Sequence, residues 1–211
     1  MMKKYFKDFI KTLETIDREP IGRLLNALES LQRASGRLFI LGIGGSAANA
    51  SHAINDFRKL TGIEAYAPTD NVAELTARTN DEGFETIFEE YLKVSRLCAN
   101  DMVLIFSVGG GNKEKNVSVN LIRALDYAKV AGAKTAGIVG RDGGYTKQVA
   151  DICVLIPTIN QYLVTPFVES MQAFIWHFFA FHPSLQINPG KWEGIALDTS
   201  PEDSISSTRD T

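Results

Sequence analysis

Two clusters of glycine, each directly after a short apolar run, constrain the fold of this chain more than any other feature. Residues 38–41 (Leu-Phe-Ile-Leu) lead into residues 42–46 (Gly-Ile-Gly-Gly-Ser), and the apolar residues 102–106 lead into residues 107–112 (Ser-Val-Gly-Gly-Gly-Asn). Glycine lets a backbone turn sharply and direct its N–H groups toward one point, where a helix N-terminus adds partial positive charge. The two junctions therefore predict strand-to-helix turns that bind an anion, and phosphate is the anion we expect first. The alternative is a pair of tight turns with no ligand.

Strand-like and helix-like segments alternate through the middle of the chain. Short apolar runs predict five strands, at residues 37–41, 63–67, 102–106, 134–139 and 152–156. Apolar residues at helical spacing predict helices at residues 46–58, 71–77, 84–95, 117–130, 145–149 and 164–181, with Ser46 as the N-cap of the first. Apolar strands that alternate with helices are typical of a parallel sheet covered on both faces. We expect an α/β fold, a three-layer αβα sandwich around a five-stranded parallel sheet.

The two ends of the chain depart from this alternation. Residues 1–35 carry two apolar helical stripes, and Pro20 suits the first turn of the second helix. Exposing both stripes would leave a large hydrophobic patch, so we expect these helices to pack in an oligomer as well as on the sheet. Residues 183–211 form a polar tail rich in Ser, Asp and Thr, and its last ~15 residues are expected to be disordered. The predicted central domain spans residues 36–182.

Charge and hydropathy exclude several classes of partner. A net charge of −3 argues against a nucleic-acid-binding surface but leaves room for a local anion site. No signal peptide is visible, and the most apolar stretch, residues 173–181, is too short to span a membrane. Cys98 and Cys153 lack metal-ligand spacing and are expected to be buried free thiols. We expect a cytoplasmic protein without a nucleic-acid or membrane partner.

Two pairs of polar residues are candidates for chemistry. His52 and Asp56 are four residues apart and share one face of a predicted helix. Glu169 and His177 are eight apart in the apolar last helix, where charged groups need partners. The alternatives are a surface His–Asp pair, a satisfied core histidine and a carboxylate at a helix start. Lys113 and Lys115 are either phosphate contacts or solvated side chains.

These motifs, in this order, resemble the SIS (sugar isomerase) domain and most closely the phosphoheptose isomerases. The resemblance covers about residues 1–182 and also includes residues 80–84 (Asn-Asp-Glu-Gly-Phe) and 140–144 (Gly-Arg-Asp-Gly-Gly). It implies a flavodoxin-like sheet, N-terminal helices that build a homotetramer, and active sites at subunit junctions. The implied substrate-binding residues are Gly44, Gly45, Ser46, Asp81, Ser107, Gly109, Gly110, Gly111 and Asn112.

The resemblance also implies a reaction, the conversion of sedoheptulose 7-phosphate to an aldose 7-phosphate through an enediol. By position, Asp56 would remove the proton and His177 would be the partnering acid or base. Some members bind zinc, and the corresponding residues here are His52, Asp56, Glu169 and His177. Two histidines and two carboxylates suit zinc or a similar divalent ion, and no nucleotide cofactor is expected.

The chain departs from the phosphoheptose isomerase pattern at several site positions. Ile43 stands where an asparagine is usual, and residues 107–112 lack hydroxyl donors of the usual Ser-Thr-Ser-Gly-Asn-Ser loop. Asp56 replaces a glutamate, and Glu169 replaces a glutamine. These departures leave the identity of the substrate open. The competing hypothesis is a non-catalytic SIS module that binds a phosphosugar or a protein such as the bacterial replication initiator.

Overall fold

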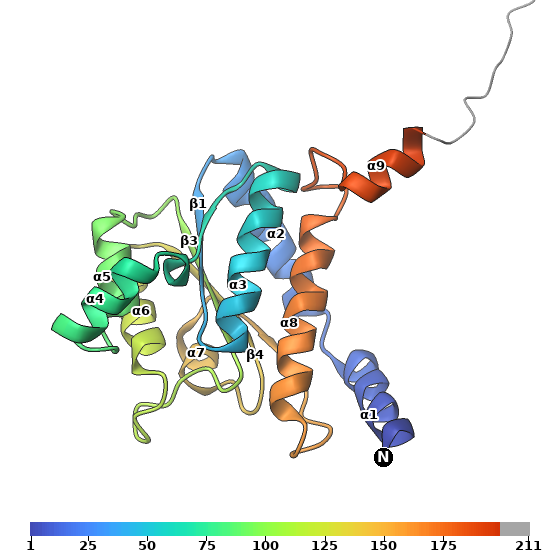
Figure 1. Cartoon of the computed structure of the whole chain (residues 1–211), viewed down its shortest axis with the longest axis horizontal. Coiled ribbons are helices and arrows are strands. Elements are labelled where there is room, and N and C mark those ends of the chain that lie inside the picture. The colour runs from blue at the N-terminus through green and yellow to red at the C-terminus, as the bar shows by residue number, and fades with distance from the viewer. Residues whose placement is uncertain (199–211) are drawn as a thin grey trace, which may run out of the picture.

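Five parallel strands form one sheet in the order β2-β1-β3-β4-β5 (Figure 1). The computed structural model describes the backbone of residues 1–198 and side chains up to residue 195. Every neighbouring pair of strands is parallel, which confirms the predicted sheet. The strands are β1 (Arg37–Leu41), β2 (Glu64–Tyr66), β3 (Met102–Ser107), β4 (Lys134–Val139) and β5 (Ile152–Leu155).

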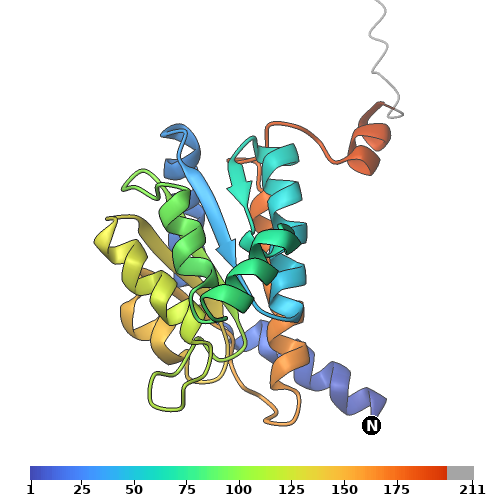
Figure 2. The same cartoon turned by 60° about the vertical axis from the view of Figure 1, so that its left-hand side comes forward.

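Helices cover both faces of the sheet, as Figures 1 and 2 show. The helices are α1 (Met2–Thr15), α2 (Glu19–Arg33), α3 (Gly45–Asp56), α4 (Val72–Asp81), α5 (Ile87–Val94), α6 (Val119–Val130), α7 (Gly144–Val149), α8 (Val164–Ala180) and α9 (Lys191–Asp198). A π-helical turn (Phe57–Thr61) continues α3, and a 3₁₀ turn (Pro68–Asp70) follows β2. One buried cluster joins α2, α3 and α8 to the sheet, and a second joins α5 and α6 to its other face.

The two N-terminal helices differ in how they pack. Leu24, Leu28 and Leu31 of α2 recur at helical spacing and are buried against the sheet, which contributes about 1.5–3 kcal/mol for each leucine. In α1, by contrast, Phe6 and Ile10 are 59% and 53% exposed. Helix α2 therefore belongs to the core, whereas α1 keeps part of its apolar stripe uncovered.

Several sequence-based predictions are wrong in detail. Ser46 is not an N-cap, because α3 begins at Gly45 and Ser46 is buried in its first turn. The second glycine cluster does not lead straight into a helix, because Asn112 and Val117 pair through two backbone hydrogen bonds before α6 begins at Val119. Cys98 is exposed rather than buried, since it lies in a turn between α5 and β3, and Cys153 is half-buried.

The polar tail is not wholly irregular, because it contains α9, which projects from the body in Figures 1 and 2. The disorder predicted for the end of the chain concerns mainly residues 199–211, which lie outside the described residues. None of the helices between residues 1 and 198 is both long and apolar enough to cross a membrane.

Candidate functional site

The two glycine turns lie side by side at the carboxyl edge of the sheet. Strands β1 and β3 are neighbours, with Leu41 opposite Ile105, and each glycine cluster follows the end of one of them. From β1 the chain crosses to β2 on one side, and from β3 it crosses to β4 on the other. In open parallel sheets, ligands bind at such a switch point, outside the carboxyl ends of the strands. The topology therefore makes this edge the candidate site.

The first turn presents free backbone donors. Gly44 has φ +63° and ψ −128°, a conformation that is essentially restricted to glycine, and nothing lies within 4 Å of the place where a side chain would be. Within the described residues, the N–H groups of Gly44, Gly45 and Ser46 have no hydrogen-bond acceptor. Free N–H groups at the start of a helix attract anions and hydroxyl oxygens. The open side of Gly44 leaves room for such a group.

Glu169 closes the other side of the same turn. A Cβ placed on Gly45 would come within 2.4 Å of Oε2 of Glu169, so the carboxylate packs directly over the glycine backbone. A second unit of negative charge about 4 Å from this carboxylate would cost about 4 kcal/mol at an effective dielectric constant near 20. The first turn therefore suits a neutral hydroxyl better than a phosphate.

Gln172, which was not among the site residues expected from the sequence, connects the first turn to α8. The buried Oε1 of Gln172 accepts hydrogen bonds from Ser46 Oγ at 3.1 Å and from Asn49 Nδ2 at 3.0 Å. Its Nε2 donates to the carbonyl oxygen of Ile138 at 3.4 Å. An uncharged amide in an otherwise apolar helix was the one signal available, because buried amides need partners. This amide sets the position of α3 relative to α8.

The second turn is shaped by its own serine and by α7. Gly110 N donates to Ser107 Oγ at 3.0 Å, and the carbonyl oxygen of Gly110 accepts from Thr146 N and Thr146 Oγ1. The N–H groups of Gly109 and Gly111 have no acceptor among the described residues. The carbonyl side of this loop is thus occupied, while two of its N–H donors are free to bind an anion.

Three polar residues that the sequence suggested as substrate contacts form hydrogen bonds to other groups of the protein instead. Hydrogen bonds to Tyr145 and Asp126 hold Lys113 and raise its pKa, so its ammonium is engaged rather than free for a phosphate. Asn112 accepts a hydrogen bond from Lys115 N at 2.7 Å and so shapes the loop. Asp81 ends α4, is exposed and accepts a hydrogen bond from Asn80.

A cavity of about 530 Å³ opens beside the first turn. It lies between that turn, the segment before α5 and the start of α6, and it is lined by Ile43, Phe84, Glu85, Asn116, Ser118, Val119 and Asn120. Its size is typical of small-molecule sites. Phe84 of the predicted 80–84 segment contributes to the wall, whereas Asp81 does not line it.

His52, Asp56 and His177 converge where α3 packs against α8. The Nε2 atoms of His52 and His177 lie 3.9 and 3.8 Å from Asp56 Oδ2, and one ligand atom from each residue falls within 4.8 Å of the others. His177 Nδ1 lies 2.8 Å from the carbonyl oxygen of Ala173, an acceptor, so Nδ1 carries a proton and Nε2 faces Asp56. Trp176 contacts both imidazole rings. Glu169 is not part of this cluster.

The donor set fits a divalent metal. Two imidazole nitrogens and a carboxylate are the ligands that zinc prefers, and three protein ligands leave a position open, as in catalytic zinc sites. The contact from His177 Nδ1 to a backbone carbonyl is the kind of outer hydrogen bond that orients a metal-binding histidine. Without a metal, the same atoms form an acid–base pair whose members could move protons.

The first glycine turn begins α3, whereas His52 and Asp56 lie in the second half of this helix. His52 and Asp56 follow Gly45 by seven and eleven residues, which corresponds to about 10 and 16 Å along the helix axis. One copy of the chain therefore does not bring the three-residue cluster directly beside the first turn.

Comparisons with known proteins agree on one family. The sequence model of the SIS domain matches residues 4–140. The chain is 32% identical over 163 residues to a phosphoheptose isomerase of Trichlorobacter lovleyi, which covers 74% of this chain and 80% of that protein. It is 34% identical over 150 residues to the lincomycin biosynthesis protein LmbN of Streptomyces lincolnensis, covering 68% of this chain but 54%, about half, of that relative.

Solved structures give the same result. The phosphoheptose isomerase GmhA from Neisseria gonorrhoeae superposes with a TM-score of 0.73 at 25% identity, covering 85% of this chain and 94% of that one. A phosphoheptose isomerase from Francisella tularensis has the same fold, with a TM-score of 0.73 at 22% identity over 85% and 94% of the two chains.

Proposed function

Because the chain belongs to the SIS domain family, we propose that it is a phosphosugar isomerase that interconverts an aldose and a ketose phosphate. The relatives named phosphoheptose isomerase make sedoheptulose 7-phosphate the first substrate to test. The observation that carries the proposal is the convergence of His52, Asp56 and His177 on one point. A purely structural module has no need for an acid–base cluster of this kind.

The proposed chemistry moves one proton between neighbouring carbons. Asp56 takes the proton from the carbon beside the carbonyl, which gives an enediol, and returns it to the former carbonyl carbon. His177 passes a proton between the two sugar oxygens, so the sugar is neither oxidised nor reduced overall. With 3.8 Å between Asp56 Oδ2 and His177 Nε2, both groups can reach adjacent atoms of one substrate.

A divalent ion, most plainly zinc, fits the same residues. His52, Asp56 and His177 would hold it, and when bound it would polarise the sugar oxygens. Glu169, the fourth ligand implied by the resemblance, lies against Gly45 instead and is not required by this proposal. The direct and the metal-assisted versions differ in whether removing the ion abolishes turnover.

The free N–H groups of the second turn are the proposed phosphate contacts. Glu169 repels a phosphate from the first turn, so Gly44, Gly45 and Ser46 would instead contact a sugar hydroxyl. Ser107 contributes by holding Gly110 in place. This assignment gives the phosphate to the second turn alone, whereas the sequence predicted that both turns bind an anion.

A complete site is proposed to form between copies of the chain in a homotetramer. The separation along α3 supports this, because a second copy can bring its own glycine turns to the cluster. Apolar side chains also remain exposed on α1 (Phe6, Ile10) and on α8 (Phe174, Phe178), with a cavity of about 500 Å³ nearby between the N-terminal helices and α8. Light scattering that reports a stable monomer at micromolar concentration would contradict this proposal. The cytoplasmic location stays a prediction.

A non-catalytic module that binds a phosphosugar is the second candidate. The bare glycines of the second turn favour it, since they replace hydroxyl donors of the isomerases. Binding to a replication initiator stays a prediction. Turnover of sedoheptulose 7-phosphate by the wild-type chain, lost in Asp56→Asn but kept in His182→Ala, would separate the enzyme from the binding module.

A further inference from the structure

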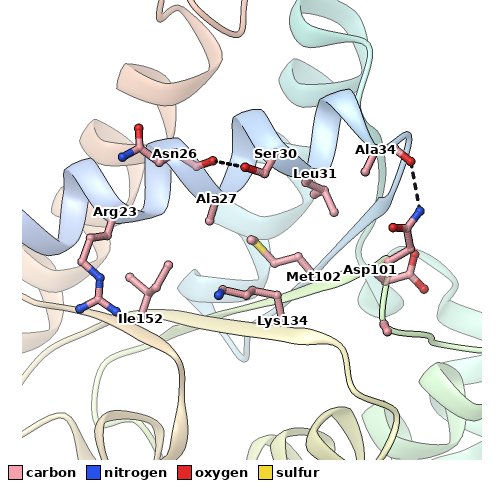
Figure 3. Close-up of a pocket in the computed structure, with 12 residues that line it drawn as sticks. Arg23, Asn26, Ala27, Ser30, Leu31, Ala34, Asp101, Met102, Lys134 and Ile152 are labelled. Carbon is pink, nitrogen blue, oxygen red and sulfur yellow. Dashed lines mark hydrogen bonds between the residues drawn. The ribbon is translucent and has the colours of Figure 1, made fainter.

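A second cavity lies at the amino edge of the sheet, opposite the edge that carries the glycine turns. It has a volume of about 430 Å³ and lies between α2 and the segments that begin β3, β4 and β5. In Figure 3, Arg23, Ala27 and Leu31 extend from α2 toward Ile152, Lys134 and Met102. We call this cavity the amino-edge groove. Nothing in the proposed isomerase reaction uses it.

The amino-edge groove has an apolar floor, and the rest of its lining is mixed, with polar as well as apolar side chains. Leu31, Met102 and Ile152 are buried, with 6%, 1% and 4% of their surface exposed. Ala27 of α2, Ala34 directly after α2, and Ala99 continue the apolar lining. Their small side chains keep α2 from filling the space above the strands. An apolar group placed here would remove further hydrophobic surface from water, which is favourable.

Two cations lie along this apolar surface. The ammonium group of Lys134 has no hydrogen bond or ion pair with any described residue. One guanidinium nitrogen of Arg23 donates to the carbonyl oxygen of Asp151 at 2.7 Å, and its Nε is 3.8 Å from Glu19 on the exposed face. The backbone contact orients the Arg23 head group and leaves it further N–H donors.

The acidic residue of the lining does not cancel these charges. Asp101 is almost fully buried and accepts hydrogen bonds from Arg37 Nε at 3.0 Å, from Arg37 Nη2 at 2.6 Å and from Cys98 N at 3.0 Å. Its charge is therefore already balanced by Arg37, which does not line the groove. The groove is locally positive in a chain whose net charge is −3. Charge and hydropathy together are complementary to a ligand with one anionic end and an apolar body.

We propose that the amino-edge groove binds a small amphipathic carboxylate. Its carboxylate lies between Lys134 and Arg23. Its apolar body covers the alanine side chains above the buried floor of the groove. The volume accommodates a bicyclic aromatic or a medium-chain aliphatic group, within the range of small-molecule sites. The ligand bridges α2 to the sheet and leaves the His52, Asp56 and His177 cluster untouched. This site does not depend on the proposed isomerase function.

The test uses 1-naphthoate as the probe, titrated into the full-length chain by isothermal calorimetry, with inorganic sulfate as an anion that lacks an apolar body. We expect naphthoate to bind at least tenfold more tightly than sulfate. The substitution Lys134→Glu, which reverses the unpaired charge, weakens the binding of naphthoate at least tenfold. Ala27→Phe, which fills the groove without adding charge, has the same effect. Lys59→Glu makes the same charge change at an exposed lysine outside the groove and leaves the affinity within twofold.

Naphthoate binding that is unchanged in both Lys134→Glu and Ala27→Phe would place the ligand elsewhere and overturn the proposal. Equal affinities for naphthoate and sulfate, or no binding of naphthoate at all, would overturn it as well. Thermal unfolding of each variant without ligand is the control for folding. Should Ala27→Phe unfold early, the comparison of Lys134→Glu with Lys59→Glu still decides the question.

Discussion

Asp56 Oδ2 on α3 lies 3.8 Å from His177 Nε2 on α8, although the two helices are far apart in the sequence. His52 Nε2 approaches the same oxygen at 3.9 Å, from one turn earlier on α3. The three side chains meet only because α3 packs on α8, and Gln172 joins these helices near the start of α3. The geometry of the cluster therefore depends on the packing of α3 on α8.

Replacing His52 by alanine should remove bound metal. Loss of one of three ligands lowers the affinity for zinc, because the remaining two cannot complete the coordination. We expect the metal content of protein saturated with zinc and then dialysed to fall at least tenfold, measured by mass spectrometry. His182→Ala is the matched control, since the hydrogen bonds of His182 within the described residues go to Ser184 and the local backbone, away from the cluster. Equal metal content in both variants would contradict a zinc site at this cluster.

Replacing Glu169 by glutamine should strengthen phosphate binding. The carboxylate packs over Gly45 beside three free N–H groups, so removing its charge removes the repulsion of an anion there. We expect the affinity for inorganic phosphate to rise at least tenfold, which is at least about 1.4 kcal/mol, by calorimetry. Glu19→Gln, at an exposed glutamate of α2, is the control for net charge. A phosphate affinity that is the same in Glu169→Gln and wild type would show that the carboxylate does not control this turn.

Replacing Gln172 by alanine should destabilise the junction of α3 and α8. The change leaves the donors of Ser46 and Asn49 without their shared acceptor in a buried position. We expect the free energy of unfolding in urea to fall by about 2–3 kcal/mol. Gln148→Ala, at an exposed position of α7, should change it by less than about 0.5 kcal/mol. Equal free energies of unfolding for the two variants would mean that the Gln172 amide does not stabilise the packing of α3 on α8.

Replacing Asp101 by asparagine should cost stability in a pH-dependent way. Burial opposes the ionisation of Asp101, but hydrogen bonds from Arg37 and Cys98 N outweigh it and lower the pKa of this carboxyl. A lowered folded-state pKa contributes stability above the unfolded value near 3.9, and this contribution disappears as the pH falls through the folded-state pKa. We expect Asp101→Asn to cost about 2–3 kcal/mol at neutral pH and progressively less in acid.

The measurement is urea unfolding of both proteins across this pH range, with Asp81→Asn as the control at an exposed aspartate. The difference in free energy of unfolding between the wild-type protein and Asp101→Asn must become smaller as the pH drops below about 4. A difference that stays constant with pH would assign the loss to packing rather than to the charge of Asp101.

The fold could be predicted in full outline because local pattern and global topology agree. The apolar runs that define the strands are short and separated by helical patterns, and the predicted bounds of β4 at residues 134–139 are those observed. The loop after β3 could not be predicted, because the pairing of Asn112 with Val117 depends on contacts that glycine content does not encode. The helix start at Gly45 was also missed, since Ser46 looks like an N-cap until its hydroxyl is seen to bond Gln172.

The candidate site was only partly predictable, for reasons of geometry. His52 and Asp56 share a helix face by spacing alone, but their approach to His177 depends on how α3 packs on α8. Glu169 precedes His177 by eight residues, about 12 Å along the helix, which places it at Gly45 rather than in the cluster. Its assignment as a metal ligand came from the resemblance, and the geometry gives it a different neighbour.

Hydrogen exchange in deuterated water, at C1 of sedoheptulose 7-phosphate and at C2 of the aldose phosphate formed from it, tests the central claim most directly, because it detects enediol formation even when the equilibrium favours one isomer. We expect zinc-replete wild-type protein to incorporate deuterium at these carbons, followed by nuclear magnetic resonance. His177→Gln should abolish the exchange while the sugar phosphate still binds, since only an interaction made in the transition state is lost. His182→Ala should exchange at the wild-type rate. If the wild-type protein binds sugar phosphates of five, six and seven carbons but exchanges none of them, the chain is a binding module and not an isomerase.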